Sequence, residues 1–276
     1  MGEVLKTLPR DGQPLFRAEL ALAERPLRRP RRLAFGLAFD SLDASAVHAW
    51  IAGRDARSDF AYVVTPNVDH VVRLENAGAE LRAAYAGAAL CLCDSRTLRR
   101  IARLLGIRLT LVPGSDLVAS LFEGILERGD RVCLIGGEAG DSLALARLYP
   151  AIEVVQHIPP MGLATNAPAR RAAAEFAARS GARVVLLAVG SPQQELLAAD
   201  IACQPQAAGT ALCIGASVDF ILGTRRRAPR LLRQAGLEWA WRLASEPRRL
   251  ARRYLVDGPR IFLIALRWWR ARRVAE

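Results

Sequence analysis

Short apolar segments alternate along the middle of the chain with stretches long enough to form helices. The apolar segments are four to eight residues long, are rich in Val, Ile and Leu, and end at turn residues, as buried strands do. The predicted strands are 61–65, 88–93, 131–135, 152–156, 182–189 and 211–214. The predicted helices are 69–86, 98–105, 115–127, 167–180 and 192–202. This alternation predicts an α/β fold, a mainly parallel sheet with helices on both faces.

Parallel sheets bind ligands at the carboxyl ends of their strands, so the residues that follow each predicted strand are candidates for a site. Thr65 and Asn67 follow the first strand, and Asn67 either caps the next helix or faces a ligand. Asp94 follows the second strand and is either a helix cap or a general base whose pKa is shifted by burial. His70 lies one helical turn after Thr65-Pro-Asn67 and could reach the cleft, but we interpret it as structural.

Two later strands also end in turns of interest. Gly136 and Gly137 open a glycine-rich turn that lets a backbone approach a phosphate, although glycine is common in such turns. In the segment Gly190-Ser-Pro-Gln-Gln-Glu195, Ser191 is placed as a helix cap and Gln194 as its capping-box partner. The amides at such a helix start attract anions, but capping alone also accounts for this segment.

Composition limits the classes of protein. The 276 residues are 52% hydrophobic, enough for one large α/β domain or two small lobes, which argues against disorder. The five cysteines are an odd number without the spacing of a zinc site, so we expect small, reduced core residues. The first thirty residues hold arginines but no apolar run like that of a secretory signal, so we expect the protein to stay in the cytoplasm.

Basic charge is concentrated at the two ends of the chain. Residues 224–276 hold fifteen arginines and four acids, which gives +11 of the net charge of +12. The same segment has four of the five tryptophans. We therefore divide the chain into a basic extension (1–33), an α/β core (34–223, with lobes near 34–128 and 129–223) and a helical, Arg- and Trp-rich appendage (224–276).

Arginine and tryptophan together fit two partners, a nucleic acid or an anionic membrane surface. The apolar run 261–266 is too short to cross a bilayer, which takes about twenty residues. Followed by Trp268, Trp269 and several arginines, it predicts a helix that lies in the membrane surface. The alternative is a core helix with a solvated face, which the adjacent tryptophans disfavour because both cannot point inward.

The motifs around these candidates form an ordered series. They are Thr65-Pro-Asn67, Asp94, Gly114-Ser-Asp116, Gly136-Gly137, Gly190-Ser-Pro-Gln-Gln-Glu195, Gly215-Ala-Ser-Val-Asp-Phe220 and Arg227-Ala-Pro229. In the tail they continue as Gly236-Leu-Glu-Trp239, Trp241-Arg-Leu243, Glu246-Pro-Arg-Arg249 and Arg252-Arg-Tyr254. The series resembles the WecG/TagA/CpsF glycosyltransferase family over about residues 33 to 262.

The resemblance implies an E-type glycosyltransferase fold with a Rossmann-like C-terminal half. It implies a hexosyltransferase that moves a sugar, with inversion and without a metal or cofactor, from a UDP-sugar to a polyprenyl-diphosphate-linked saccharide. Asp94 would be the general base. The implied substrate-binding residues are Thr65, Asn67, Gly136, Gly137, Gly190, Ser191, Gln194, Asp219, Arg227, Arg242, Arg249 and Arg252. The implied location is the inner face of the plasma membrane, with no nucleic-acid partner and a possible homo-oligomer.

The sequence supports the metal-free mechanism independently, because no Asp-x-Asp occurs in the 276 residues. Arginine can stabilise a leaving diphosphate instead. Ser95, Cys93, Gln193 and Leu111 depart from the family pattern near the sugar pocket, so N-acetylmannosamine, glucuronate and glucose donors all stay open.

Two other classes of protein make different demands on the sequence. A Rossmann-type oxidoreductase needs a Gly-x-Gly-x-x-Gly turn, which the turn at 136–140 does not supply. A basic nucleic-acid-binding protein predicts binding that weakens steeply with salt.

Overall fold

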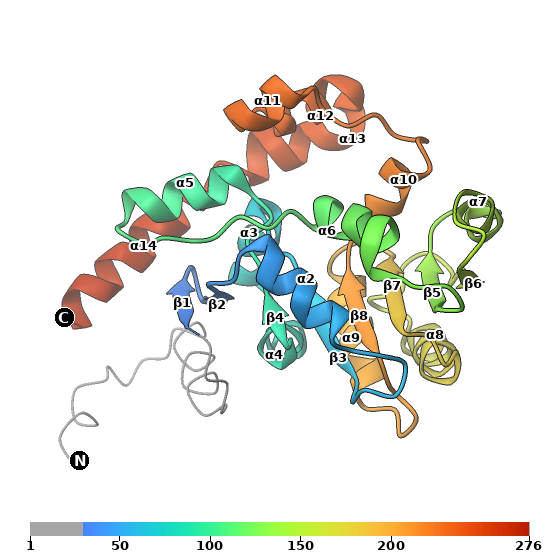
Figure 1. Ribbon diagram of the computed structural model, residues 1–276. Helices are drawn as coiled ribbons and strands as arrows, with labels where there is room; N and C mark the ends of the chain where they lie inside the picture. Colours follow the sequence, from blue (N-terminus) through green and yellow to red (C-terminus); the bar gives the residue numbers. More distant parts are fainter. Residues whose placement is uncertain (1–29, 276) are drawn as a thin grey trace, which may run out of the picture.

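A six-stranded, all-parallel sheet forms the centre of the molecule (Figure 1). The structure is a computed structural model that describes residues 30–275, with side chains through Arg272, so nearly all of the predicted extension 1–33 lies outside the described residues. The strands are β3 (Ala61–Val64), β4 (Leu90–Cys91), β5 (Arg131–Gly136), β6 (Glu153–His157), β7 (Val184–Ala188) and β8 (Thr210–Cys213). Their order in the sheet is β4-β3-β8-β7-β5-β6.

Each predicted strand overlaps one strand of this sheet, so the predicted α/β class is confirmed. The least regular is β4, where only Leu90 and Cys91 join the ladder and Cys93 makes an isolated bridge to Leu111. Strand β3, from the first predicted lobe, pairs with β8, from the second. Both lobes therefore contribute to one sheet, and the boundary between them stays a prediction.

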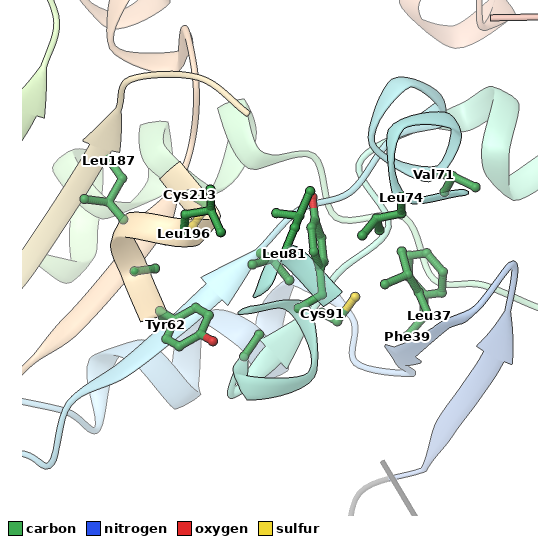
Figure 2. Packing of buried hydrophobic residues seen from close by; sticks show 14 of the residues in the cluster. Leu37, Phe39, Tyr62, Val71, Leu74, Leu81, Cys91, Leu187, Leu196 and Cys213 are labelled. Carbon is green, nitrogen blue, oxygen red and sulfur yellow. The ribbon is translucent and has the colours of Figure 1, made fainter. Parts of the chain in front are cut away.

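Both faces of the sheet are buried, which explains why the strands read as continuous apolar runs. Side chains alternate between two core clusters: Tyr62 and Val64 belong to one, and Val63 to the other. In β7 the same alternation sends Val185 to the first cluster and Leu186 to the second. Figure 2 shows part of the first cluster, in which side chains from strands and helices meet on one side of the sheet.

The helices divide between the two faces. The first core cluster takes residues from α3 (Val68–Glu75), α4 (Ala79–Gly87), α5 (Arg96–Leu104), α8 (Ala167–Arg179) and α9 (Gln193–Ala202). The second takes residues from α2 (Ala44–Ala52), α6 (Gly114–Ser120), the π-helical turn η1 (Leu121–Ile125), α7 (Asp141–Leu148) and α10 (Ser217–Ile221). A small hairpin of β1 (Arg31–Ala34) and β2 (Leu37–Asp40) adds to the first face.

Some predicted helices differ in their extent. The segment predicted as one helix at 69–86 is two, because α3 ends before Asn76 and Gly78 starts α4. The predicted helix at 115–127 begins as α6 and continues as the π-helical turn η1. The predicted helices do not include α2, α7 or α10, and the hairpin was not predicted.

The cysteines follow their predicted role with one exception. Cys91, Cys93, Cys133 and Cys213 are buried, and burial raises the pKa of each thiol. Cys203 is exposed. All five are free thiols, and four of them serve as small apolar residues in the core.

The C-terminal segment is helical, as predicted. It consists of α11 (Arg230–Ala235), α12 (Glu238–Ser245), α13 (Pro247–Ala251), the π-helical turn η2 (Arg252–Asp257) and α14 (Arg260–Ala275). In Figure 1, α11, α12 and α13 lie on the side of the sheet toward which the strand arrows point, and α14 runs beside α5. The appendage therefore reaches the edge at which the candidate residues lie.

Helix α14 is held on the core by apolar and ionic contacts. Ile261, Ile264 and Ala265 are buried, and Trp268 packs on Phe35 with ring centroids 5.9 Å apart. On α3, Glu75 pairs with Arg260 (3.7 Å) and Arg267 (2.5 Å), and Asp69 pairs with Arg253 of η2 (3.3 Å). The appendage is thus docked on α3, the helix that Asn67 caps.

The run 261–266 is both a core element and an exposed apolar surface. Its residues Phe262, Leu263 and Leu266 are exposed, and so are Leu255 and Val256 just before it. Trp268 and Trp269 are both half-buried, and Trp268 is the one that packs against the first core cluster. Within residues 30–275, no helix is long and apolar enough to cross a membrane.

Candidate active site

Asp94 lies at the carboxyl edge of the sheet and does not cap the helix that follows it. Ser95 is the cap of α5, because its hydroxyl accepts from the Leu98 amide at 3.2 Å. The carboxylate of Asp94 is instead held between two loops. Its Oδ1 accepts from the Gly114 amide at 2.8 Å, and its Oδ2 accepts from Asn67 Nδ2 at 3.4 Å.

The surroundings of Asp94 make its carboxylate more basic than an ordinary aspartate. Burial is the largest cause and raises its pKa to about 6. Three groups lower the pKa of Asp94: the backbone amide of Gly114, the charge of Arg242 and the side-chain amide of Asn67. The charge of Glu238 raises it further. A carboxylate with a pKa this close to neutrality is suited to accept a proton from a hydroxyl as a bond forms.

Asn67 combines the two roles that the sequence left open. Its Oδ1 accepts from the Asp69 amide at 3.1 Å and caps α3, while its Nδ2 donates to Asp94. Thr65 is buried, and its hydroxyl donates to the Cys213 carbonyl at 3.2 Å, which ties the end of β3 to the end of β8. Both residues therefore fix the geometry of the edge next to Asp94.

Gly114 brings α6 close to this edge. A Cβ at this position would lie 2.9 Å from Thr65 Oγ1, so the helix start approaches Thr65 as closely as it does only because residue 114 is glycine. The next two residues meet the appendage: Arg227 donates to the Ser115 hydroxyl and to Asp116 Oδ1. The Gly114-Ser-Asp116 motif thus joins the core and the appendage beside Asp94.

Gln194 is buried, and its amide is occupied by neighbours. Its Nε2 donates to Glu195 Oε1 at 2.8 Å, and its Oε1 accepts from the Gly215 amide at 2.9 Å. The predicted capping box is therefore wrong: α9 starts at Gln193 without a side-chain cap. Gln194 cannot reach back to Ser191 because Glu195 and Gly215 hold it.

The glycine-rich turn after β5 is organised by acids. Gly136 and Gly137 have positive φ, and a Cβ on Gly137 would lie 2.6 Å from Asp141 Oδ2. The same oxygen accepts from the Glu138 amide at 2.7 Å, so this amide is already bonded within the turn. Asp219 pairs with Arg225 at 3.0 Å, and its pKa is raised by burial and by Asp141 and Glu138. This side of the edge is acidic.

Gly190 also has positive φ, and no atom lies within 4 Å of where its Cβ would be. Glycine is needed there for the backbone conformation and not for space. Gly190 lies in the loop between β7 and α9, and its carbonyl accepts from the Gln194 backbone amide at 2.9 Å. The structure therefore places it at the edge that the sequence predicts.

Two of the four arginines named from the sequence lie at this edge. Arg242 pairs with Glu238 at 2.8 Å and lies over the Phe220 ring at 5.5 Å, and its charge lowers the pKa of Asp94. Arg227 lies over the same ring at 5.6 Å. Phe220 thus holds two guanidinium groups, each through a cation–π contact.

The other two arginines are largely exposed. Arg249 donates to the two carboxylate oxygens of Glu246 through Nε and Nη2, at 2.5 and 2.9 Å. Arg252 has 87% of its side chain exposed and lies 3.9 Å from Asp257. Their proposed contact with a diphosphate stays a prediction.

Several residues at this edge were missed as site residues. The Gly114 amide, Glu238 and the buried Glu195 all act on named site residues, and His70 was interpreted as structural. The one signal in the sequence was a glutamate directly after a proposed pocket residue and directly before an apolar run. The structure shows that this glutamate is buried, which is rare without a partner.

Comparison with known families agrees with this geometry. A family model described as "Glycosyl transferase WecG/TagA/CpsF family" matches residues 32–275. The chain belongs to the WecG/TagA/CpsF family of glycosyltransferases. The match includes the appendage and extends past residue 262, where the resemblance in the sequence ended. It makes the protein a glycosyltransferase and favours neither an oxidoreductase nor a nucleic-acid-binding protein.

Proposed function

We propose that this glycosyltransferase moves a sugar from a UDP-sugar to a polyprenyl-diphosphate-linked saccharide, with inversion and without a metal, and that Asp94 is its general base. The observation that carries the proposal is the Asp94 carboxylate itself. It lies at the ligand-binding edge of a parallel sheet, two donors orient it, and its pKa is about 6.

In the proposed reaction, Asp94 removes the proton from the acceptor hydroxyl. The hydroxyl oxygen attacks the anomeric carbon of the donor from the face opposite the UDP group, so the configuration inverts. The bond between the anomeric carbon and the diphosphate breaks, and UDP leaves with the electron pair. Arg242 and Arg227 are the cations best placed to stabilise the charge that develops on the diphosphate.

Thr65, Asn67 and Gln194 support this reaction from behind the reacting atoms. Each uses its polar side-chain atoms to join the ends of neighbouring strands, through Cys213, Asp94 and Gly215 respectively. We propose that they set the shape of the pocket for the sugar. Gly136, Gly137, Gly190, Ser191 and Asp219 would border the donor on the other side of the edge. The donor is N-acetylmannosamine, glucuronate or glucose linked to UDP.

We also propose that the appendage holds the protein on the inner face of the plasma membrane. Five apolar side chains of η2 and α14 are exposed, at residues 255, 256, 262, 263 and 266. Arg252, Arg260, Arg267 and Arg270 accompany them on the same two elements. Exposed apolar residues next to arginines are typical of helices that lie in an anionic interface.

The test of the reaction offers the full-length protein a panel of UDP-sugars with polyprenyl-diphosphate-linked acceptors. One pair should give a product of inverted configuration, and EDTA should leave its rate unchanged. Asp94→Asn should lower the rate at least about a hundredfold, which is the scale of a lost general base. Asp55→Asn, which changes an exposed acid before β3, should not. Full turnover by Asp94→Asn would remove Asp94 from this role.

The test of membrane binding measures flotation with vesicles that contain anionic lipid. Leu263→Ser should weaken binding, because Leu263 is 56% exposed on α14. Leu143→Ser is the matched control, since Leu143 is 57% exposed on α7. Equal loss of binding in both variants, or no loss in either variant, would argue against a membrane surface on the appendage.

A further inference from the structure

A buried carboxylate lies behind the site and has no role in the reaction proposed above. Glu195 of α9 has a side chain that is 1% exposed. Its Oε1 accepts from Gln194 Nε2, and its Oε2 is buried without a hydrogen bond. Burying a carboxylate costs free energy unless neighbouring groups compensate for the lost water. The groups that contact the Glu195 carboxylate must therefore compensate for its burial.

The ring of His70 faces this carboxylate, with Nε2 4.0 Å from Glu195 Oε1. On its other side, His70 Nδ1 accepts from the Asn67 amide at 3.0 Å. An acceptor nitrogen carries no proton, so the proton of the neutral ring is on Nε2, the atom that points to Glu195. His70 thus links the buried carboxylate to the backbone of Asn67.

Burial favours the neutral form of the His70 ring. Burial lowers its pKa, and Arg253 and Arg73 act in the same direction, while Glu195 and Asp69 oppose them. A second proton on Nδ1 would remove the acceptor for the Asn67 amide. Neutral His70 is therefore the form that preserves the start of α3.

Asn67 transmits this constraint to Asp94. Its Oδ1 accepts from the Asp69 amide, so its NH2 group must be the end that faces Asp94. Its own backbone N–H is held by His70. The path from Glu195 to Asp94 therefore runs through His70 and Asn67, with a hydrogen bond or a close polar contact at each step.

We propose that His70 and Glu195 are positioning residues for Asp94: His70 holds Asn67 against the carboxylate, and Glu195 holds both His70 and Gln194. The role of His70 and Glu195 in catalysis rests on the proposed function of Asp94 as base. Their effect on the titration of Asp94 does not depend on that function. One oxygen acceptor suffices at position 195, because Oε1 both accepts from Gln194 and faces His70, so the negative charge itself is not required. At position 70, an acceptor for the Asn67 amide is required.

The test follows the titration of Asp94 in the full-length protein with aspartate labelled with carbon-13 at its carboxyl group. Asp94→Asn identifies its signal. In His70→Leu the Asn67 amide loses its acceptor, so the Asn67 side chain should leave Asp94. Because that donor lowers the pKa of Asp94, the titration midpoint should rise by about half to one pH unit, the worth of one hydrogen bond.

His70→Gln is the matched variant, because glutamine at the third position of a helix can accept from the backbone of the cap residue. It should restore the midpoint of the wild type. Glu195→Gln should also leave it unchanged, since one amide oxygen can still accept from Gln194, and Glu195→Leu should raise it. A midpoint that His70→Leu and Glu195→Leu do not move, or that His70→Gln moves equally, would overturn the proposal.

A measurement on the unmodified chain guards against variants that fail to fold. With histidine labelled with nitrogen-15, the signals of the three histidines report which ring nitrogen carries the proton. His70 should stay neutral with its proton on Nε2 at neutral pH, and a proton on Nδ1 would contradict the proposal. Transfer is measured separately: a shifted Asp94 titration without transfer to any acceptor would refute the proposed function and leave the positioning role intact.

Discussion

Asp94 illustrates how a functional residue lowers stability. Its pKa is raised by burial from 3.8 to about 6, so the folded protein holds this proton more tightly than the unfolded chain does. The stability that protonated Asp94 confers is complete below about pH 4 and is lost as the pH rises through 6. At neutral pH the protein therefore carries an ionised group that its fold disfavours.

Asp94→Asn should consequently be more stable than the wild type above neutral pH. Asparagine keeps an acceptor for the Gly114 amide and carries no charge to desolvate. We expect a gain of about 1–3 kcal/mol at about pH 8, which shrinks as the pH falls from 6 toward 4. Urea unfolding at a series of pH values measures it. A variant that is less stable than the wild type at every pH would contradict the raised pKa.

Gly114 gives a second prediction at the scale of one residue. In Gly114→Ala the new methyl group would lie 2.9 Å from Thr65 Oγ1, so α6 must move away and the amide must leave Asp94. We expect a loss of about 1–3 kcal/mol, as for other overpacked sites. Gly124→Ala is the control, because no atom lies within 4 Å of its Cβ position. Thermal unfolding should separate the two variants, and equal melting temperatures would contradict the close approach.

The residues at the carboxyl edge of the sheet could be predicted from the sequence, but the side chains that contact them could not. Asp94, Asn67 and Thr65 follow predicted strands, and periodicity alone brings them to one edge. The link between His70 and Glu195 could not be predicted, since the two residues are far apart in the chain and meet only when α3 and α9 pack. The capping box of Ser191 failed because the Gln194 side chain binds its neighbour Glu195 and the distant Gly215 instead.

At the scale of elements, periodicity predicted the strands because both faces of the sheet are buried. It failed where local geometry decided the outcome. The β1–β2 hairpin turns at Phe35 and Gly36, both with positive φ, and a Phe-Gly pair is not among the usual sequence signals for such a turn. The break between α3 and α4 did carry a signal, Gly78, but its apolar surroundings favoured one long helix.

Helix α14 has two apolar sides with different roles, and adjacent residues can test them. Ile264 is buried against the core, and Leu263 is exposed. Ile264→Ala should destabilise the docked helix by about 2–4 kcal/mol, and Leu263→Ala should change stability by less than about 0.5 kcal/mol. Hydrogen exchange of the α14 amides measures both. If Leu263→Ala also loosened the helix, its exposed side would be part of the fold and not a binding surface.

For the whole molecule, charge separates the core from the appendage and also joins them. The described core and the appendage carry opposite net charge, and Asp69 and Glu75 of α3 receive Arg253, Arg260 and Arg267. Helix α3 therefore holds the appendage with these two acids, while Asn67 at its start contacts Asp94. Docking of the appendage and the geometry of the site are properties of the same helix.

Removal of the appendage should therefore abolish transfer in solution as well as binding to vesicles. A chain that ends at Gly223 lacks Arg242, which acts on Asp94, and Arg227, which contacts Ser115 and Asp116. We expect its rate with a soluble acceptor to fall at least about a hundredfold, as when preorganised charge is removed from a site. A chain that ends at Arg270 keeps both arginines and Trp268, and should retain most of its rate. Full activity of the shorter chain would restrict the appendage to membrane binding and place the whole site within the sheet and its loops.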